Sequence, residues 1–374
     1  MRAINLGRKS LWSVLLIIFF LPISTFAKVS LQDRLQSLLN TTVAASRTPG
    51  AVLLVSSPSL GTITVAAGYA DKENKTPMTI DNNFRVASIS KTFLTVAILK
   101  LIEQGLLKLD DHIETLLPFT LDTSRIPNCN KASIRNLLQM RSGIPNYVKY
   151  ASYLQLIKKL NGKIWVPEYC IRLVYDDKPH FSPNRSFEYS NTNFLLLQLI
   201  VEKLRGGSYA NAIETEVLKP LNLQQTFVET KEWTSNHLRT RGYAWTGINV
   251  SDVTDLNDGL GLADAGMITT VNDLHAFLKA LLQDKTLMQP DSLKNMLDMN
   301  DEYGLGIWEE RINGEKAYSH NGIASGFQGQ YYYFPKERLT IILLTNYFDT
   351  DLLINFVPQV HEVVSHELEE QIGN

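Results

Sequence analysis

Strand-like segments stand near both ends of this chain, and this separation constrains its fold more than any other feature. Near the N-terminus, AVLLVSS (51–57) and TITVAAGYA (62–70) flank a turn from Pro58 to Gly61. Near the C-terminus, segments rich in β-branched and aromatic residues are KAYSH (316–320), GFQGQYYYFP (326–335) and LTIILLTN (339–346). An isolated hairpin is marginally stable in water, so we expect all of these strands to share one antiparallel sheet. The sequence therefore predicts an α+β fold with a large insertion in the middle of the chain.

Helical patterns fill much of that insertion and also flank the strands. Apolar residues recur at helical spacing in 29–45, 84–105, 131–140, 153–160, 192–207 and 351–372, with Pro358 interrupting the last pattern. We assign residues 28–104 and 217–374 to an α+β lobe, in which helices flank the antiparallel sheet. Residues 105–216 form a predicted inserted all-α lobe. A binding site is expected in the cleft between two such lobes.

The first 27 residues have the pattern of a secretory signal peptide. A positively charged start (Arg2, Arg8 and Lys9) precedes an apolar run over 11–23, and small residues allow cleavage after Ala27. The run is short for a membrane span of about 20 residues, so we expect no stable span after cleavage. An uncleaved N-terminal anchor is the alternative. The predicted location is periplasmic or secreted.

Composition and cysteine content narrow the functional classes. The 374 residues carry a formal net charge of −2, which offers no electrostatic case for nucleic acid as a partner. Cys129 and Cys170 could form a disulfide in an oxidising compartment, and two buried free thiols fit the sequence equally well. The chain has no CxxC and no HExxH pattern, so we expect no metal site.

A lysine in the stretch RVASISKTFL (85–94) is difficult to explain structurally. Ser88 would be an ordinary cap at the start of a helix, but Glu or Gln is the preferred partner three residues later. Lys91 occupies that position instead, where a cation near a helix N-terminus is disfavoured by about 0.3–1 kcal/mol. A plain cap would not select this residue.

Catalysis does explain it. A serine hydroxyl is a weak nucleophile until a nearby base accepts its proton. Burial and the positive end of a helix both lower the pKa of a lysine from about 10.4, so Lys91 could be that base. Residues three apart on a helix are neighbours, so the side chains of Ser88 and Lys91 can meet.

Two further motifs support a catalytic interpretation of Ser88 and Lys91. Tyr189-Ser190-Asn191 stands at the start of a helical stretch in the middle of the chain, and His320-Asn321-Gly322 at the end of a C-terminal strand. Each has a structural alternative. Tyr189 could be a half-buried loop aromatic, Asn191 a helix cap, His320 an ordinary strand residue and Gly322 a turn glycine.

With these three motifs, SxxK, YxN and HxG, the chain resembles the serine β-lactamase and penicillin-binding protein superfamily. The resemblance is greatest to the branch of class C β-lactamases, DD-carboxypeptidases of the same fold and related esterases. It spans about residues 31–346 and includes ASIRNLLQMRSGIP (132–145), VLKPLNLQQTFV (217–228), GLADAGMITTVNDLHAFL (261–278) and YGLGIW (303–308). It implies one hydrolase domain over residues 28–374, with a sheet flanked by helices and an all-helical lobe.

The resemblance also implies a role for each motif residue. Ser88 would be the acylated nucleophile. Its base would be Lys91 alone or Lys91 together with Tyr189, an alternative that the sequence leaves open, and the Tyr189 phenol would protonate the leaving group. Asn191 would hydrogen-bond the substrate amide. The backbone N–H groups of Ser88 and Ile323 would form the oxyanion hole, and no metal or organic cofactor is implied.

The third motif departs from the class C β-lactamase pattern. His320 and Gly322 would line the substrate side of the pocket, but His320 replaces a lysine and is mostly neutral at pH 7. It would bind a substrate carboxylate less strongly, which favours a peptidase or esterase over an efficient β-lactamase. Ile323 stands where a small residue is usual, so its bulk would narrow the pocket.

These observations predict an exported serine hydrolase that works through an acyl-enzyme on Ser88. A DD-carboxypeptidase acting on D-Ala-D-Ala peptides is the first choice, followed by an esterase or amidase and then a β-lactamase. The expected partner is a small peptide, ester or β-lactam substrate, including a peptidoglycan stem peptide. The alternative from another class is a non-catalytic protein that binds penicillin or peptidoglycan, for which Lys91 would have no use.

Overall fold

The computed structural model describes residues 29–160, 165–229, 237–256, 259 and 261–373. The predicted signal peptide, residues 1–27, lies outside the described residues, so its cleavage and export stay predictions. Among the helices in the described ranges, none is both long enough and apolar enough to cross a membrane.

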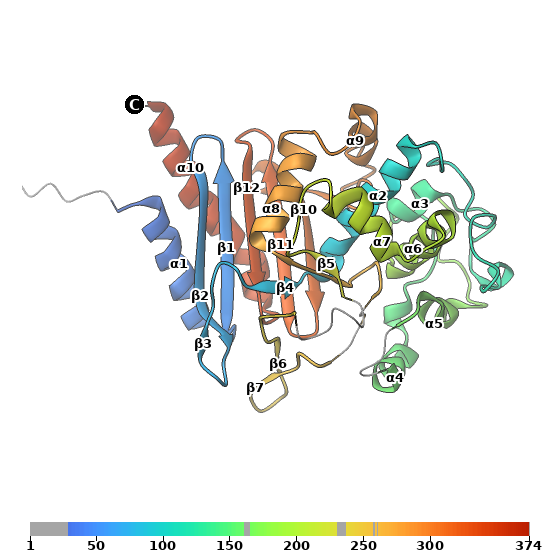
Figure 1. Ribbon diagram of the computed structural model, residues 1–374, viewed down its shortest axis with the longest axis horizontal. Coiled ribbons are helices and arrows are strands. Elements are labelled where there is room, and N and C mark those ends of the chain that lie inside the picture. Colours follow the sequence, from blue (N-terminus) through green and yellow to red (C-terminus); the bar gives the residue numbers. More distant parts are fainter. Residues whose placement is uncertain (1–28, 161–164, 230–236, 257–258, 260, 374) are drawn as a thin grey trace, which may run out of the picture.

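A seven-stranded antiparallel sheet joins the two ends of the chain (Figure 1). Its order is β3-β2-β1-β12-β11-β10-β9. The strands are β1 (Gly50–Ser57), β2 (Gly61–Asp71), β3 (Thr76–Pro77), β9 (Trp308–Ile312), β10 (Glu315–Ala324), β11 (Phe327–Phe334) and β12 (Leu339–Thr345). β1 lies beside β12, with Ala51 opposite Thr345 and Val55 opposite Ile341. The prediction of one sheet built from both chain ends is confirmed.

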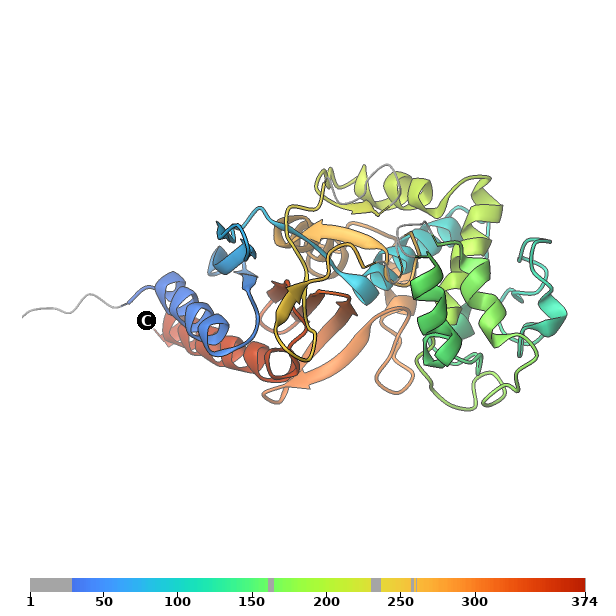
Figure 2. The same cartoon turned by 90° about the horizontal axis from the view of Figure 1, so that it is seen from below.

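Helices cover both faces of this sheet. The helices of the described ranges are α1 (Leu31–Ala45), α2 (Ser90–Glu103), α3 (Ile134–Leu138), α4 (Ala151–Leu160), α5 (Pro167–Ile171), α6 (Asn191–Arg205), α7 (Tyr209–Ile213), α8 (Val271–Leu278), α9 (Pro290–Met296) and α10 (Val357–Gly373). α1 and α10 lie side by side against one face, where Figure 2 shows them as the blue and red helices. α2 and α8 pack on the opposite face. Every residue of β1 is buried because both of its faces are covered.

The helices α3 to α6 gather away from α1 and α10, beyond the edge of the sheet (Figure 1). They share the larger apolar core with α2 and α8, so sheet and helices stabilise one another. This arrangement confirms the predicted α+β class with an inserted helical part. Short strands complete the fold: β4 (Asn83–Arg85), β8 (Met267–Thr270) and β5 (Phe227–Val228) form one small sheet, and β6 (Tyr243–Trp245) and β7 (Val250–Asp252) another.

The predicted helix over 84–105 is wrong at its start. β4 pairs with β8, a short 3₁₀ turn follows at Ala87–Ile89, and α2 begins only at Ser90. The apolar run could not show this, because pairing with β8 depends on residues far along the chain. The predicted end is confirmed: Gly105 has φ +74° and its N–H bonds the carbonyl of Ile102, as in a glycine cap.

The two cysteines are not paired. Cys129 and Cys170 are both buried free thiols, so the disulfide alternative does not hold in this structure.

Pro358 is the second residue of α10, and a π-helical turn over Leu352–Phe356 precedes it. The helical pattern is therefore interrupted just before the proline, as expected for a residue that lacks a backbone N–H.

Candidate active site

Ser88 lies on a tight connection between β4 and α2. The preceding strand is anchored by Arg85, whose guanidinium makes two 2.9 Å bonds to the buried carboxylate of Glu229. Ala87 then adopts φ +45°, a left-handed conformation that costs a non-glycine residue about 1–3 kcal/mol. Such strain persists only where the surroundings hold it, and it occurs here next to the predicted nucleophile.

The side chains of Ser88 and Lys91 meet as predicted, although Ser88 lies in the 3₁₀ turn before α2 and not in α2 itself. The Lys91 Nζ lies 2.9 Å from the Ser88 Oγ and 2.7 Å from the backbone carbonyl oxygen of Asp264. Lys91 is fully buried, whereas Ser88 is partly exposed. A substrate can therefore reach the hydroxyl while the amine behind it stays out of water.

Burial changes the acidity of Lys91. Loss of solvent lowers the pKa of Lys91 to about 8, and the negative charge of Asp264 partly opposes this effect. The Nζ also lies over the rings of Tyr189 and Phe194, 5.1 Å and 5.5 Å from their centroids. A lysine with this pKa is partly neutral near pH 7–8 and can accept a proton.

The Tyr189 phenol also lies beside the Ser88 hydroxyl. It forms a side-chain hydrogen bond with Ser88, and burial raises the pKa of Tyr189 well above 10. The phenol therefore keeps its proton and can donate it. Tyr189 and Lys91 thus approach Ser88 from two different elements, which the sequence motifs could suggest but not establish.

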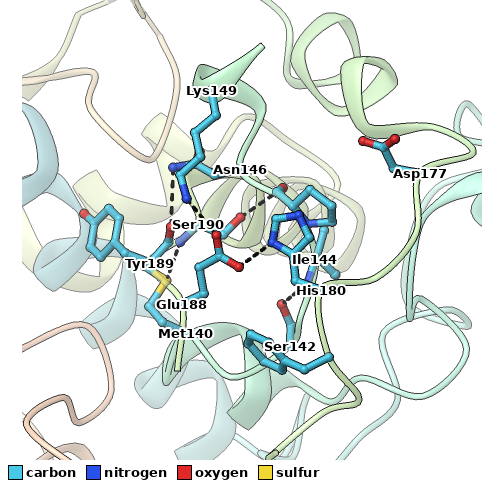
Figure 3. A network of polar contacts seen from close by, with 12 residues as sticks. Met140, Ser142, Ile144, Asn146, Lys149, Asp177, His180, Glu188, Tyr189 and Ser190 are labelled. Carbon is cyan, nitrogen blue, oxygen red and sulfur yellow. Dashed lines mark hydrogen bonds and ion pairs between the residues drawn. The ribbon is translucent and has the colours of Figure 1, made fainter. Parts of the chain in front are cut away.

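A second chain segment holds the Tyr189 loop in place (Figure 3). The Asn146 amide donates to the carbonyl of Tyr189 at 3.4 Å and accepts from the Asn191 N–H at 3.2 Å. Glu188 pairs with Lys149 at 2.7 Å and with His180, while the Tyr189 ring points away from its carboxylate. These contacts hold one side of the loop, here called its outer side. The other, inner side carries the Tyr189 ring and faces Ser88.

Asn191 is the first residue of α6, and Ser190 is the cap, so the alternative that Asn191 caps a helix at Thr192 is wrong. The Asn191 Oδ1 is buried and has no hydrogen-bond partner in the part of the chain that the structure describes. An unpaired buried acceptor is costly. A substrate amide N–H, the predicted partner, would remove that cost.

His320 is buried beside Lys91 and is engaged on both ring nitrogens. Its Nδ1 donates to the Asn321 carbonyl at 2.7 Å, which leaves Nε2 to accept from the Tyr303 hydroxyl at 3.3 Å. Burial and the charge of Lys91 lower the pKa of His320 to about 3. The residue is therefore neutral at physiological pH, in line with the sequence argument.

Gly322 brings β10 against the Ser88 turn. A methyl group at this position would lie 2.1 Å from the Val86 oxygen and 2.8 Å from the Ser88 nitrogen, so only glycine allows the approach. The N–H of Ile323 follows directly, which is compatible with the predicted oxyanion pair. Side chains alternate along a strand, so the Ile323 side chain, 46% exposed, lies on the face opposite Gly322. This placement does not support the expectation that its bulk narrows the pocket, which stays a prediction.

Three nearby residues were missed by the motif analysis. Asp264 contacts Lys91 through its carbonyl and is 2% exposed, and Tyr147 donates to its carboxylate at 2.9 Å. Tyr303 packs on Trp308 with ring centroids 4.6 Å apart. In the sequence, Asp264 is an acid within the apolar stretch GLADAGM, and Tyr303 is the tyrosine of YGLGIW. Neither stretch indicates which residue the side chain contacts.

Metal binding finds no support in the described ranges: no three His, Cys, Asp or Glu side chains gather there as ligands. The acidic groups near Lys91 are Asp264 and phenols, which serve hydrogen bonds instead. The expectation that the chain needs no cofactor stays a prediction.

Comparison with known proteins gives one family. The family model described as Beta-lactamase matches residues 35–355. Penicillin-binding protein 4* of Bacillus subtilis (strain 168) is 28% identical over 300 residues, covering 75% of this chain and 64% of that protein. Protein flp of Staphylococcus aureus (strain COL) is 26% identical over 347 residues, covering 90% and 66%. The chain thus spans slightly less than two thirds of the length of these relatives.

Solved structures agree in fold over most of the chain. The D-amino acid amidase from Ochrobactrum anthropi SV3, complexed with L-phenylalanine amide, superposes with a TM-score of 0.77 at 25% identity. The match covers 91% of this chain and 97% of that one. A D-stereospecific amidohydrolase from Streptomyces sp. gives a TM-score of 0.72 at 27% identity, covering 83% and 93%.

Proposed function

The chain belongs to the β-lactamase family, and we propose that it is a serine hydrolase that cleaves amide bonds of small D-amino acid derivatives through an acyl-enzyme on Ser88. The observation that carries the proposal is the contact between Ser88 and Lys91. The amine lies 2.9 Å from the hydroxyl and its pKa is lowered to about 8. A protein that only binds penicillin or peptidoglycan has no use for this arrangement.

The proposed acylation uses the described contacts in sequence. Neutral Lys91 accepts the Ser88 proton as Oγ attacks the substrate carbonyl carbon. The oxyanion is stabilised by the N–H groups of Ser88 and Ile323. Tyr189 then donates its proton to the leaving nitrogen, and the Lys91 ammonium returns a proton to Tyr189. Water later attacks the acyl group, releasing the acid and free Ser88.

The choice of a substrate without a carboxylate on the leaving side rests on His320. A neutral imidazole with both nitrogens engaged adds no positive charge, so it gives little help in binding a carboxylate on the leaving side. Amide and ester substrates have no carboxylate at that position. The likeness to the D-amino acid amidase and the D-stereospecific amidohydrolase supports this class.

A D-Ala-D-Ala carboxypeptidase is the second candidate, favoured by the similarity to penicillin-binding protein 4*. Its substrate ends in a carboxylate, for which His320 supplies no charge. We further propose that the protein is exported by its first 27 residues. N-terminal sequencing of the protein from the extracytoplasmic fraction tests this, and an intact N-terminus would contradict cleavage.

Covalent labelling tests the proposed function directly. The purified protein is incubated with a fluorescent penicillin and with p-nitrophenyl acetate, and the modified peptide is identified by mass spectrometry. We expect the label on Ser88 and none in Ser88→Ala. Initial rates are then compared for D-phenylalanine amide, its L-enantiomer, a D-Ala-D-Ala peptide and nitrocefin. Faster turnover of the D-amide supports the proposal, and absence of both label and turnover refutes it.

A further inference from the structure

Asp264 contacts Lys91 through its backbone and acts on it through its charge, but has no place in the mechanism above. Asp264 precedes β8, is 2% exposed, and its backbone oxygen accepts the Lys91 Nζ at 2.7 Å. The amine is therefore held between this oxygen and the Ser88 hydroxyl, which points its nitrogen at the nucleophile.

The side chain of Asp264 has its own donor on the far side. The Tyr147 hydroxyl lies 2.9 Å from Oδ2, and Tyr147 is 1% exposed. Burial and the charge of Asp264 raise the pKa of Tyr147 well above 10, so the phenol stays protonated and donates. This hydrogen bond provides a donor for Oδ2 and fixes the orientation of the carboxyl group.

We propose that Asp264 is a positioning residue for acylation: its carbonyl oxygen aims Lys91 at Ser88, and its carboxylate sets the pH at which Lys91 becomes a base. This inference rests on the proposed function, because it assigns Asp264 a role in the same proton transfer. Without the carboxylate, the buried amine would lose its proton at a lower pH.

The other titratable groups around Lys91 are neutral in the relevant pH range. Tyr189 approaches from the segment before α6 with a raised pKa, and His320 approaches from β10 with a pKa near 3. Around Asp264, burial raises the pKa of Cys170 and of Tyr209. Among these described groups, Asp264 is the one whose negative charge acts on Lys91.

Asp264→Asn tests the inference because it removes the charge and keeps the backbone oxygen. The acid limb of kcat/KM, which should lie near pH 8 in the wild type, is expected to move about 1–3 pH units lower. Activity at pH 6, relative to the plateau of each protein, should rise tenfold or more. A purely structural role would lower the plateau and leave the limb unmoved, and that result overturns the proposal.

Two matched variants separate charge from packing. Asp291→Asn makes the same change at an exposed position in the first turn of α9 and should leave the limb unmoved. Tyr147→Phe removes the donor but keeps the Asp264 charge, so its limb should not move to lower pH. If Asp264→Asn does not fold, as judged by circular dichroism, Asp264→Ala tests the same loss of charge.

A readout independent of turnover distinguishes this inference from the proposed function. The protein is labelled with ¹³C,¹⁵N-lysine, the Lys91 signal is assigned with Lys91→Arg, and its titration is followed by NMR. We expect the titration midpoint to fall in Asp264→Asn even if no substrate is turned over. Equal midpoints overturn the role of Asp264, whereas absence of both the Ser88 label and turnover overturns only the proposed function.

Discussion

Two lysines reach the segment that contains Tyr189, and they do so in opposite environments. Lys91 approaches the inner side, is fully buried and contacts the Ser88 hydroxyl. Lys149 approaches the outer side, is 59% exposed and pairs with Glu188 at 2.7 Å. Figure 3 shows the outer pair together with His180.

The difference shows how burial assigns a role to the same side chain. An exposed ion pair is screened by water and contributes about 0–1 kcal/mol, so Lys149 can do little more than tie the loop. Burial makes the charged form of an amine unfavourable, and it lowers the pKa of Lys91 to about 8. Lys149 orders the site, and Lys91 can carry out proton transfer in it.

The largest expected difference is between the two lysines themselves. Lys91→Met should reduce the rate of Ser88 acylation about 10²–10⁴-fold, the usual contribution of a general base. Lys149→Met should stay within a few-fold of wild type, because it removes only an exposed ion pair. Stopped-flow acylation with a chromogenic ester measures both rates. Equal losses would remove the distinction between the inner and outer lysine.

A methyl group at Gly322 should have the next largest effect. Gly322→Ala directs a carbon at the Val86 oxygen and the Ser88 nitrogen, so β10 must move away from the nucleophile. Loss of one oxyanion donor costs about 10²–10³ in kcat, and we expect a loss in that range. The matched control is Gly207→Ala, where the nearest described atom is 3.8 Å away. A Gly322→Ala variant with wild-type kcat would contradict the predicted oxyanion hole.

The pH dependence of kcat/KM should report the titration of Lys91 and not that of His320. Lys91 must be neutral to act, so kcat/KM should fall about tenfold for each pH unit below about 8. With a pKa of about 3, His320 should add no limb near 6.5. A limb at 6.5 that disappears in His320→Gln would show that the histidine is the base.

The smallest effect should come from the outer ion pairs. Burial raises the pKa of Glu188, but hydrogen bonds from Lys149 and His180 outweigh it, so the net pKa is lowered. The stabilisation is thus fully present above about pH 4.5 and is lost as pH falls through the lower folded value. Glu188→Gln should reduce the free energy of unfolding by about 0–1 kcal/mol at pH 7 and by less at pH 3. Urea unfolding at the two pH values measures this, and a larger loss at pH 3 would contradict it.

Local patterns explain why so much of the fold was predictable. Strands such as β1 and β12 are continuous apolar runs, and α6 and α10 have clear helical spacing, so neighbouring residues suffice to identify them. The motifs containing Ser88 and Tyr189 are equally local. The start of α2 was mispredicted because β4 is a strand only through its pairing with β8.

By itself, the sequence determined the α+β class, the sheet shared by both chain ends and the residue types that meet at Ser88. Only the tertiary structure decided how those groups behave. Lys91 is held by the carbonyl of Asp264, 173 residues away, and His320 is turned onto Tyr303. The physical reason is that a pKa and a hydrogen bond depend on the surrounding groups and on the exclusion of water, which the folded chain assembles from distant segments.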